Sequence, residues 1–201
     1  MKKLFILICV GFISTQNFAQ STLTADQRKF AMDYLNQTKQ DFLKAVEGLT
    51  ISQLTFKADT TKWSILDCAE HIALAEQGIF SIVQGQLKQP SDSLKQKEIT
   101  VKEKDIIARL TNRTFKVQSP ETIKPSGKFP NIEAIKQFFT KQRDNCIAYV
   151  GITNDDVHYH YWKHPATGTI DLYQTIILMA AHCKRHTLQI GEVKANVNFP
   201  K

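Results

Sequence analysis

The sequence lacks the features that would assign it to several large functional classes. It has four cysteines in 201 residues, and their spacing matches no CxxC pair or other zinc-binding pattern. No apolar run after residue 13 is long enough to cross a bilayer, so we expect no integral membrane segment in the mature chain. The formal net charge is +7, but the lysines are scattered and no basic patch is interleaved with aromatic residues. We therefore expect no nucleic-acid partner.

Residues 1–19 have the composition of a secretory signal peptide. Lys2 and Lys3 precede an apolar run from Leu4 to Ile13, and the small residue Ala19 provides a cleavage site. We therefore predict export to the periplasm or the extracellular space, and a single domain formed by residues 20–201.

Three cysteines remain in that domain, at positions 68, 146 and 183. An oxidising compartment permits a disulfide, and an odd number of cysteines leaves at least one thiol free. Their places in apolar helical patterns favour a different interpretation, in which all three are buried as small apolar side chains.

Apolar residues at helical spacing predict four long helices, over residues 24–48, 64–86, 131–150 and 170–195. Thr24, Ser64 and Thr169 are the expected N-terminal caps. Within the third helix, Arg143 is either an exposed helix charge or a buried anchor, and exposure is slightly favoured. This pattern predicts an all-α fold, a helical bundle with a long connection between its second and third helices.

The connection, residues 87–130, is rich in proline and lysine. Thr100 and Glu103 match a capping box, which predicts one short helix within it. A connection of this length is unusual in a compact domain. It either crosses from one end of the bundle to the other or covers a site as a lid.

His182 and His186 lie four residues apart in the last helix, so their side chains stack on one face. Leu172, Met179 and Val193 recur at heptad spacing with His186, which places the pair on a core-facing row. Two buried imidazoles need a partner that compensates for the loss of water. Coordination of a divalent metal is favoured over burial as hydrogen-bonded histidines.

His71 in the second helix is the candidate third ligand, because Ala75 and Gly78 leave space beside its ring. Three imidazoles suit Zn²⁺, Ni²⁺ or Fe²⁺ and leave open positions for water or substrate. The HExxH pattern of metalloproteases requires a glutamate after the first histidine. Cys183 occupies that position, which disfavours peptide hydrolysis by that mechanism.

Other polar residues are weaker candidates. His158, His160 and His164 lie in an aromatic-rich loop, where a second metal site is less favoured than packing and hydrogen bonding. Glu70 and Glu76 flank His71, either as bases and partners of the metal ligands or as exposed helix carboxylates. Arg185 is expected to be exposed or salt-bridged rather than catalytic, and the sequence alone identifies no catalytic residue.

The chain resembles the DinB-like superfamily of four-helix-bundle proteins over nearly the whole mature length. The resemblance is carried by Trp63-Ser64-Ile65 with His71, by His164-Pro165 with Gly168, and by Ala181-His182, Arg185-His186 and Gln189-Ile190. It implies that His71, His182 and His186 hold a divalent metal and that a homodimer can form. The long connection and the signal peptide depart from the smaller intracellular relatives.

The resemblance also implies a metal-dependent enzyme acting on a small molecule. A transferase whose substrate is a thiol and a hydrolase both remain open, since a metal lowers the pKa of a bound thiol as well as that of bound water. The thiol route fits an exported protein less naturally, because cytosolic thiols would not be at hand. The alternative is a non-catalytic metal-binding or interaction module with the same bundle.

Overall fold

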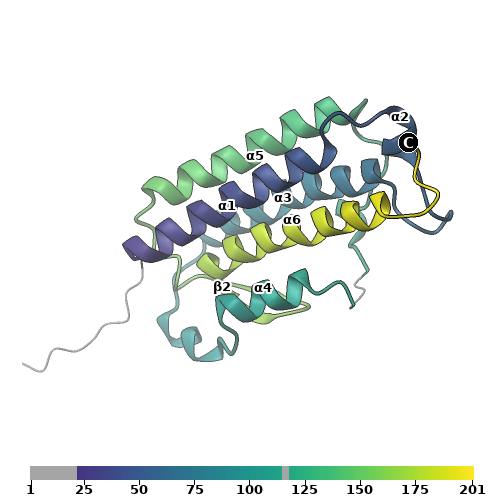
Figure 1. The fold of residues 1–201 in the computed structure, drawn as a ribbon. Helices are drawn as coiled ribbons and strands as arrows, with labels where there is room; N and C mark the ends of the chain where they lie inside the picture. Colours follow the sequence, from purple (N-terminus) through teal and green to yellow (C-terminus); the bar gives the residue numbers. More distant parts are fainter. Residues whose placement is uncertain (1–21, 115–117) are drawn as a thin grey trace, which may run out of the picture.

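Four long helices run side by side in the computed structural model, which describes residues 22–114 and 118–201 (Figure 1). They are α1 (Ala25–Val46), α3 (Ile65–Gln86), α5 (Ile132–Ile152) and α6 (Leu172–Lys194). Each packs against two others, in the spatial order α1, α6, α3, α5 and back to α1. The predicted four-helix bundle is confirmed, while the predicted signal peptide lies outside the described residues.

The predicted caps of α1 and α3 are confirmed. Thr24 and Gln27 exchange side-chain hydrogen bonds with each other's backbone amides at the start of α1. Ser64 and Asp67 do the same at the start of α3. Gly48, just past the end of α1, has φ +67°, a left-handed conformation that glycine adopts without a Cβ clash.

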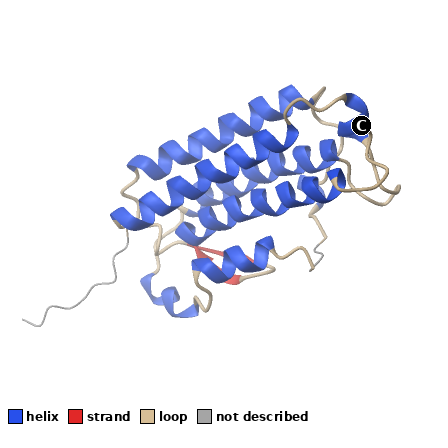
Figure 2. Cartoon of the chain, in the orientation of Figure 1, coloured by secondary structure: helices blue, strands red, loops and turns tan. Residues whose placement is uncertain are grey.

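The last helix begins later than the sequence predicts. Thr169 belongs to a short strand, and Asp171 is the residue that caps α6, by accepting a hydrogen bond from the Gln174 amide. The strands β1 (Tyr161–His164) and β2 (Gly168–Asp171) form an antiparallel hairpin, drawn red in Figure 2, with His164 opposite Gly168.

The described segments between the bundle helices also contain four short helical elements. The helix α2 (Ile51–Thr55) lies between α1 and α3, and the connection from α3 to α5 holds η1 (Ser93–Glu98), α4 (Glu103–Thr111) and η2 (Glu121–Ile123). The expected cap at Thr100 is wrong, since α4 starts at Glu103 with Lys102 as its cap. The helix α4 packs along α6, and η2 packs against α3. The connection therefore covers the bundle from outside.

Arg143 is fully buried, which contradicts the expectation of an exposed residue. Its guanidinium forms a two-pronged ion pair with the Glu76 carboxylate, also buried. It further donates to the Thr38 hydroxyl at 2.6 Å and to the Leu35 carbonyl at 2.7 Å. These contacts join α1, α3 and α5 at one point inside the core.

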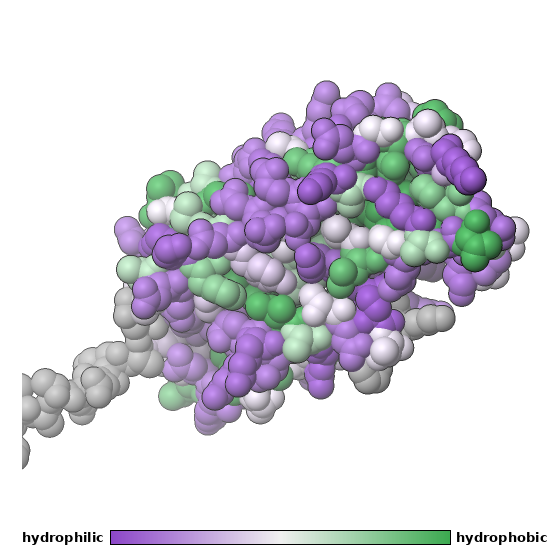
Figure 3. Space-filling model, viewed as in Figure 1, coloured by the Kyte–Doolittle hydropathy of each residue, from purple (hydrophilic) through white to green (hydrophobic). Residues whose placement is uncertain are grey.

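The three cysteines of the described chain are buried and free, as the apolar interpretation predicts. Hydrophilic side chains cover most of the face drawn in Figure 3, with apolar ones scattered among them. Among the described helices, none has the length and apolar character needed to cross a membrane.

Candidate metal centre

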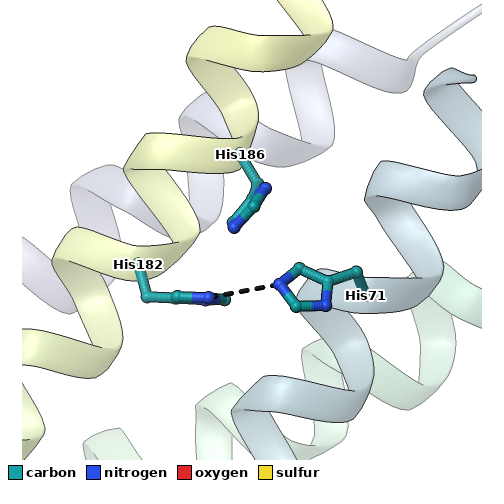
Figure 4. A group of neighbouring side chains, drawn as sticks. All are labelled: His71, His182 and His186. Carbon is teal, nitrogen blue, oxygen red and sulfur yellow. Dashed lines mark hydrogen bonds between the residues drawn. The ribbon is translucent and has the colours of Figure 1, made fainter. Parts of the chain in front are cut away.

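The structure brings together the three histidines singled out in the sequence (Figure 4). One nitrogen from each of His71, His182 and His186 lies within 4.8 Å of the other two. The closest pair is His71 Nε2 and His182 Nε2, which are 3.2 Å apart. This convergence follows from the packing of α3 against α6, with His182 and His186 on successive turns facing His71.

The rings lie largely inside the bundle. His71 and His186 are buried and His182 is half-buried. Trp63, just before α3, places its indole 4.8 Å from the His71 ring and 5.9 Å from the His186 ring, measured between centroids. The aromatic side chain thus closes one side of the group and limits how far these two rings can rotate.

Hydrogen bonds outside the group fix the proton on His71. Its Nδ1 lies 2.7 Å from the carbonyl oxygen of Ile123, which can only accept, so Nδ1 carries the proton. In the neutral ring Nε2 then has a lone pair, and His182 must donate in the 3.2 Å contact between the two Nε2 atoms. A metal ion would take the place of the proton that the two rings share. The nitrogen donors present here therefore fit a metal site.

His186 is oriented in the same manner. Its Nδ1 donates to the Gln189 side-chain oxygen at 2.9 Å, which leaves its Nε2 unprotonated. Two of the three imidazoles therefore have the tautomer that a metal ligand needs, with an acceptor on the opposite nitrogen.

Burial lowers the pKa of all three histidines. The pKa of His182 and of His186 falls well below 6.5, because desolvation penalises the charged ring and neighbouring positive charges add to the effect. Burial also lowers the pKa of His71, partly offset by its bond to Ile123. The rings are therefore neutral at neutral pH, the state in which imidazole binds a metal.

The spacing is close to that of a three-nitrogen site. Ligand nitrogens about 2.0–2.1 Å from a metal, at tetrahedral or octahedral angles, lie about 2.8–3.4 Å from one another. The 3.2 Å contact between His71 and His182 falls in this range, and His186 has its nearest nitrogen within 4.8 Å of both. A small adjustment of one side chain separates this group from a coordinating one.

The carboxylates next to His71 are engaged elsewhere. Glu70 and Glu76 are both buried, so the expectation of exposed helix carboxylates is wrong for each. Glu76 is paired with Arg143. Glu70 accepts hydrogen bonds from the amides of Ser126, Gly127 and Lys128. Neither carboxylate remains available as a base at the histidines.

The histidines of the aromatic-rich loop have other partners. His158 Nδ1 lies 2.7 Å from Asp171, and His160 Nε2 lies 3.0 Å from Asp156. His164 Nδ1 accepts a hydrogen bond from the Ala166 amide at 3.2 Å. Across residues 22–114 and 118–201, the three bundle histidines form the only metal-binding group found. The packing interpretation of this loop therefore describes the structure.

Arg185 is also buried rather than exposed, and it donates to the carbonyl oxygens of Leu110 and Asn112. It joins the end of α4 to α6 beside His186. The sequence also gave no indication of the role of Ile123, because a backbone carbonyl has no residue signature. Gln189 could have been found, since it lies one helical turn after His186.

Comparison with known proteins agrees with this architecture. The family model described as the DinB superfamily matches residues 34–190. The chain is 22% identical over 166 residues to the uncharacterized protein YuaE of Bacillus subtilis (strain 168), covering 83% of this chain and 98% of YuaE.

A solved structure is also similar. YfiT from Bacillus subtilis, described as a probable metal-dependent hydrolase with an unusual four-helix bundle topology, aligns with a TM-score of 0.59. The alignment covers 89% of this chain and 92% of YfiT at 15% sequence identity. At this identity the likeness shows a shared fold.

Proposed function

Because this chain belongs to the DinB superfamily, we propose that it is a metal-dependent enzyme that acts on a small molecule. His71, His182 and His186 hold a divalent ion, which is zinc, nickel or iron. The observation that carries the proposal is the meeting of three neutral imidazoles, two of them with the metal-binding nitrogen kept unprotonated by a hydrogen bond on the other side.

The chemistry follows from the donor set. A divalent ion bound by three neutral ligands keeps its full positive charge and lowers the pKa of water or a thiol in its open positions. The protein's own residues orient the rings through Ile123 and Gln189 and exclude solvent on one side through Trp63. With Glu70 and Glu76 already engaged, proton transfer from the nucleophile falls to the substrate or to solvent.

We favour hydrolysis over transfer to a thiol. The description of YfiT as a probable metal-dependent hydrolase supports this choice. The alternative is a transferase acting on a thiol. The response of Co²⁺-substituted protein to a small thiol distinguishes it from a hydrolase.

Metal analysis tests the site. Wild-type protein purified without a histidine tag is expected to bind about one equivalent of Zn²⁺, and a His182→Ala, His186→Ala double variant almost none, because a single remaining imidazole binds weakly. His160→Ala is the matched control, since it removes an imidazole that bonds to Asp156 outside the group. Equal metal in the wild type and the double variant contradicts the proposal.

Co²⁺-substituted protein tests whether the ion has an open position. An enzyme of this kind should show a changed visible spectrum when azide is added, because azide displaces water from the ion. A new charge-transfer band on adding a small thiol supports the transferase. An unchanged spectrum with both additions supports a non-catalytic metal-binding module.

A further inference from the structure

Glu70 occupies an unusual environment directly beside the metal centre. It precedes His71 on α3, and its side chain is 3% exposed. Its carboxylate accepts hydrogen bonds from three successive backbone amides, those of Ser126 at 3.1 Å, Gly127 at 3.0 Å and Lys128 at 3.0 Å. Burying a carboxylate is costly unless several donors surround it, and here backbone amides supply them.

The turn that supplies these amides is shaped for an anion. Gly127 has φ +73°, a left-handed conformation, whereas neither of its neighbours, Ser126 and Lys128, has a positive φ. Alternation of this kind directs successive N–H groups to one point, and such a concavity binds a negative group. The turn lies on the surface, with Ser126, Gly127 and Lys128 all exposed, and the Glu70 carboxylate holds its backbone amides against α3.

The same stretch of chain contacts His71. The Ile123 carbonyl accepts the Nδ1 proton of His71 at 2.7 Å, and the Ser119 hydroxyl lies 3.4 Å from the same nitrogen. Residues 119–128, here called the strap, are thus held by two adjacent residues of α3. Successive helix residues point about 100° apart, so the two contacts grip the strap from different directions.

We propose that Glu70 is a positioning residue for the metal centre. By anchoring the strap, it holds the Ile123 carbonyl against His71 and keeps the Nε2 lone pair of His71 directed at the metal. The inference rests on the proposed function, because it requires a metal at the three histidines. Coupling between two binding events is reciprocal, so metal binding also strengthens the anchoring of the strap.

The affinity for Zn²⁺, measured by competition with a chelator, gives the first test. Glu70→Gln should weaken binding about 10–100-fold, the usual effect of removing a partner of a metal ligand. Glutamine keeps the shape of glutamate but loses its charge. Its NH2 group, itself a donor, would also face the backbone N–H groups of the strap, which need an acceptor. Glu133→Gln is the matched control, because Glu133 is an exposed glutamate that pairs with Lys136 on α5. Its affinity should equal that of the wild type.

A double-mutant cycle separates positioning from loss of structure. In a His71→Ala background, Glu70 has no ligand to position, so Glu70→Gln should cause no further loss of the remaining Zn²⁺ affinity. An equal loss with and without His71 means that Glu70 acts on the fold as a whole, and this result overturns the inference.

Hydrogen exchange gives the reciprocal readout. Adding Zn²⁺ to the wild type should slow amide exchange at Ser126, Gly127 and Lys128, and the same addition to His71→Ala should leave their rates unchanged. A wild type that binds no Zn²⁺ overturns the proposed function together with this inference. A wild type that binds it, with Glu70→Gln of equal affinity, overturns the inference alone.

Discussion

Arg143 shows that a helical pattern can place a charged residue on a buried row without identifying what pairs with it. Phe139 lies one turn before it and Cys146 one turn after it, both buried, but nothing at helical spacing identifies its partner. That partner is Glu76, which is 67 residues away. Inside the bundle each of the two charges compensates the other. If either residue were replaced, its partner would become a buried and unpaired ion.

Arg143→Leu should therefore destabilise the protein by about 3–5 kcal/mol, because it leaves the Glu76 carboxylate buried without its counter-charge. Urea unfolding measures this loss. Lys136→Ala, which breaks the exposed Lys136–Glu133 pair, is the control and should cost less than about 1 kcal/mol.

The double variant Glu76→Leu, Arg143→Leu should recover part of the loss, since it removes both charges. If Arg143→Leu costs no more than Lys136→Ala, the buried pair does not hold the helices together.

The metal centre was more predictable than this ion pair for a physical reason. Three residues of one rare type, placed on core-facing rows, leave few explanations for their burial. The sequence could therefore indicate that His71, His182 and His186 meet. It could not indicate what Glu70 does, because its partners are backbone amides that any residue would supply.

At the scale of elements, Asp171 joins three parts of the fold. One carboxylate oxygen caps α6 through the Gln174 amide, and the other accepts a hydrogen bond from His158 Nδ1. His158 Nε2 in turn lies 3.2 Å from the side-chain oxygen of Gln27, in the capping box of α1. The starts of two bundle helices are thereby tied to the hairpin.

Asp171→Ala should lower the free energy of unfolding by about 2–4 kcal/mol, since it removes a helix cap and leaves a buried His158 N–H without an acceptor. Asp171→Asn should cost less, because the single side-chain oxygen of asparagine can still cap α6, although the NH2 group that replaces the other oxygen cannot accept from His158. Urea denaturation compares both with Thr50→Ala, which removes the cap of the exposed helix α2. A loss for Asp171→Ala no larger than that for Thr50→Ala speaks against the three-way link.

The four bundle helices could be predicted nearly to the residue because long apolar periodicity and capping boxes coincide in α1 and α3. The hairpin could not, since strands of four residues show too little alternation to be distinguished from a loop. Thr169 was a reasonable cap by residue type, but strand pairing with Lys163 places it outside the helix. The short helix α2 was also missed, although Thr50 and Gln53 form a capping box there.

At the scale of the whole molecule, the long connection has a definite path. It crosses from the end of α3 to the opposite end of the bundle, where α5 starts, and on the way α4 packs along α6 and the strap is fixed to α3 beside His71. Both helices that carry the histidines are therefore covered from outside by the connection. Its length is explained by the two separate surfaces that it reaches.

We propose that the protein is exported, on the evidence of residues 1–19. Expression of the full-length gene in its own host should give a mature N-terminus near Gln20, because the small residue Ala19 precedes the cleavage site. Mass spectrometry of the intact protein from separated cell fractions measures this. Replacing Lys2 with glutamate should reduce processing, while Lys201→Glu serves as a charge-matched control far from residues 1–19. An uncleaved chain confined to the cytoplasm contradicts the proposal.

The two helices that would share the ion lie far apart along the chain, since His71 and His182 are 111 residues apart. A metal bridging them closes a loop of that length, as a disulfide between the same positions would, and such a closure is entropically costly in an unfolded chain. The ion can therefore bind tightly only after α3 and α6 have docked, and it stabilises the docked state by mass action. For a chain that folds after transport, the metal that it acquires is then set by the ions present in the compartment where these helices meet.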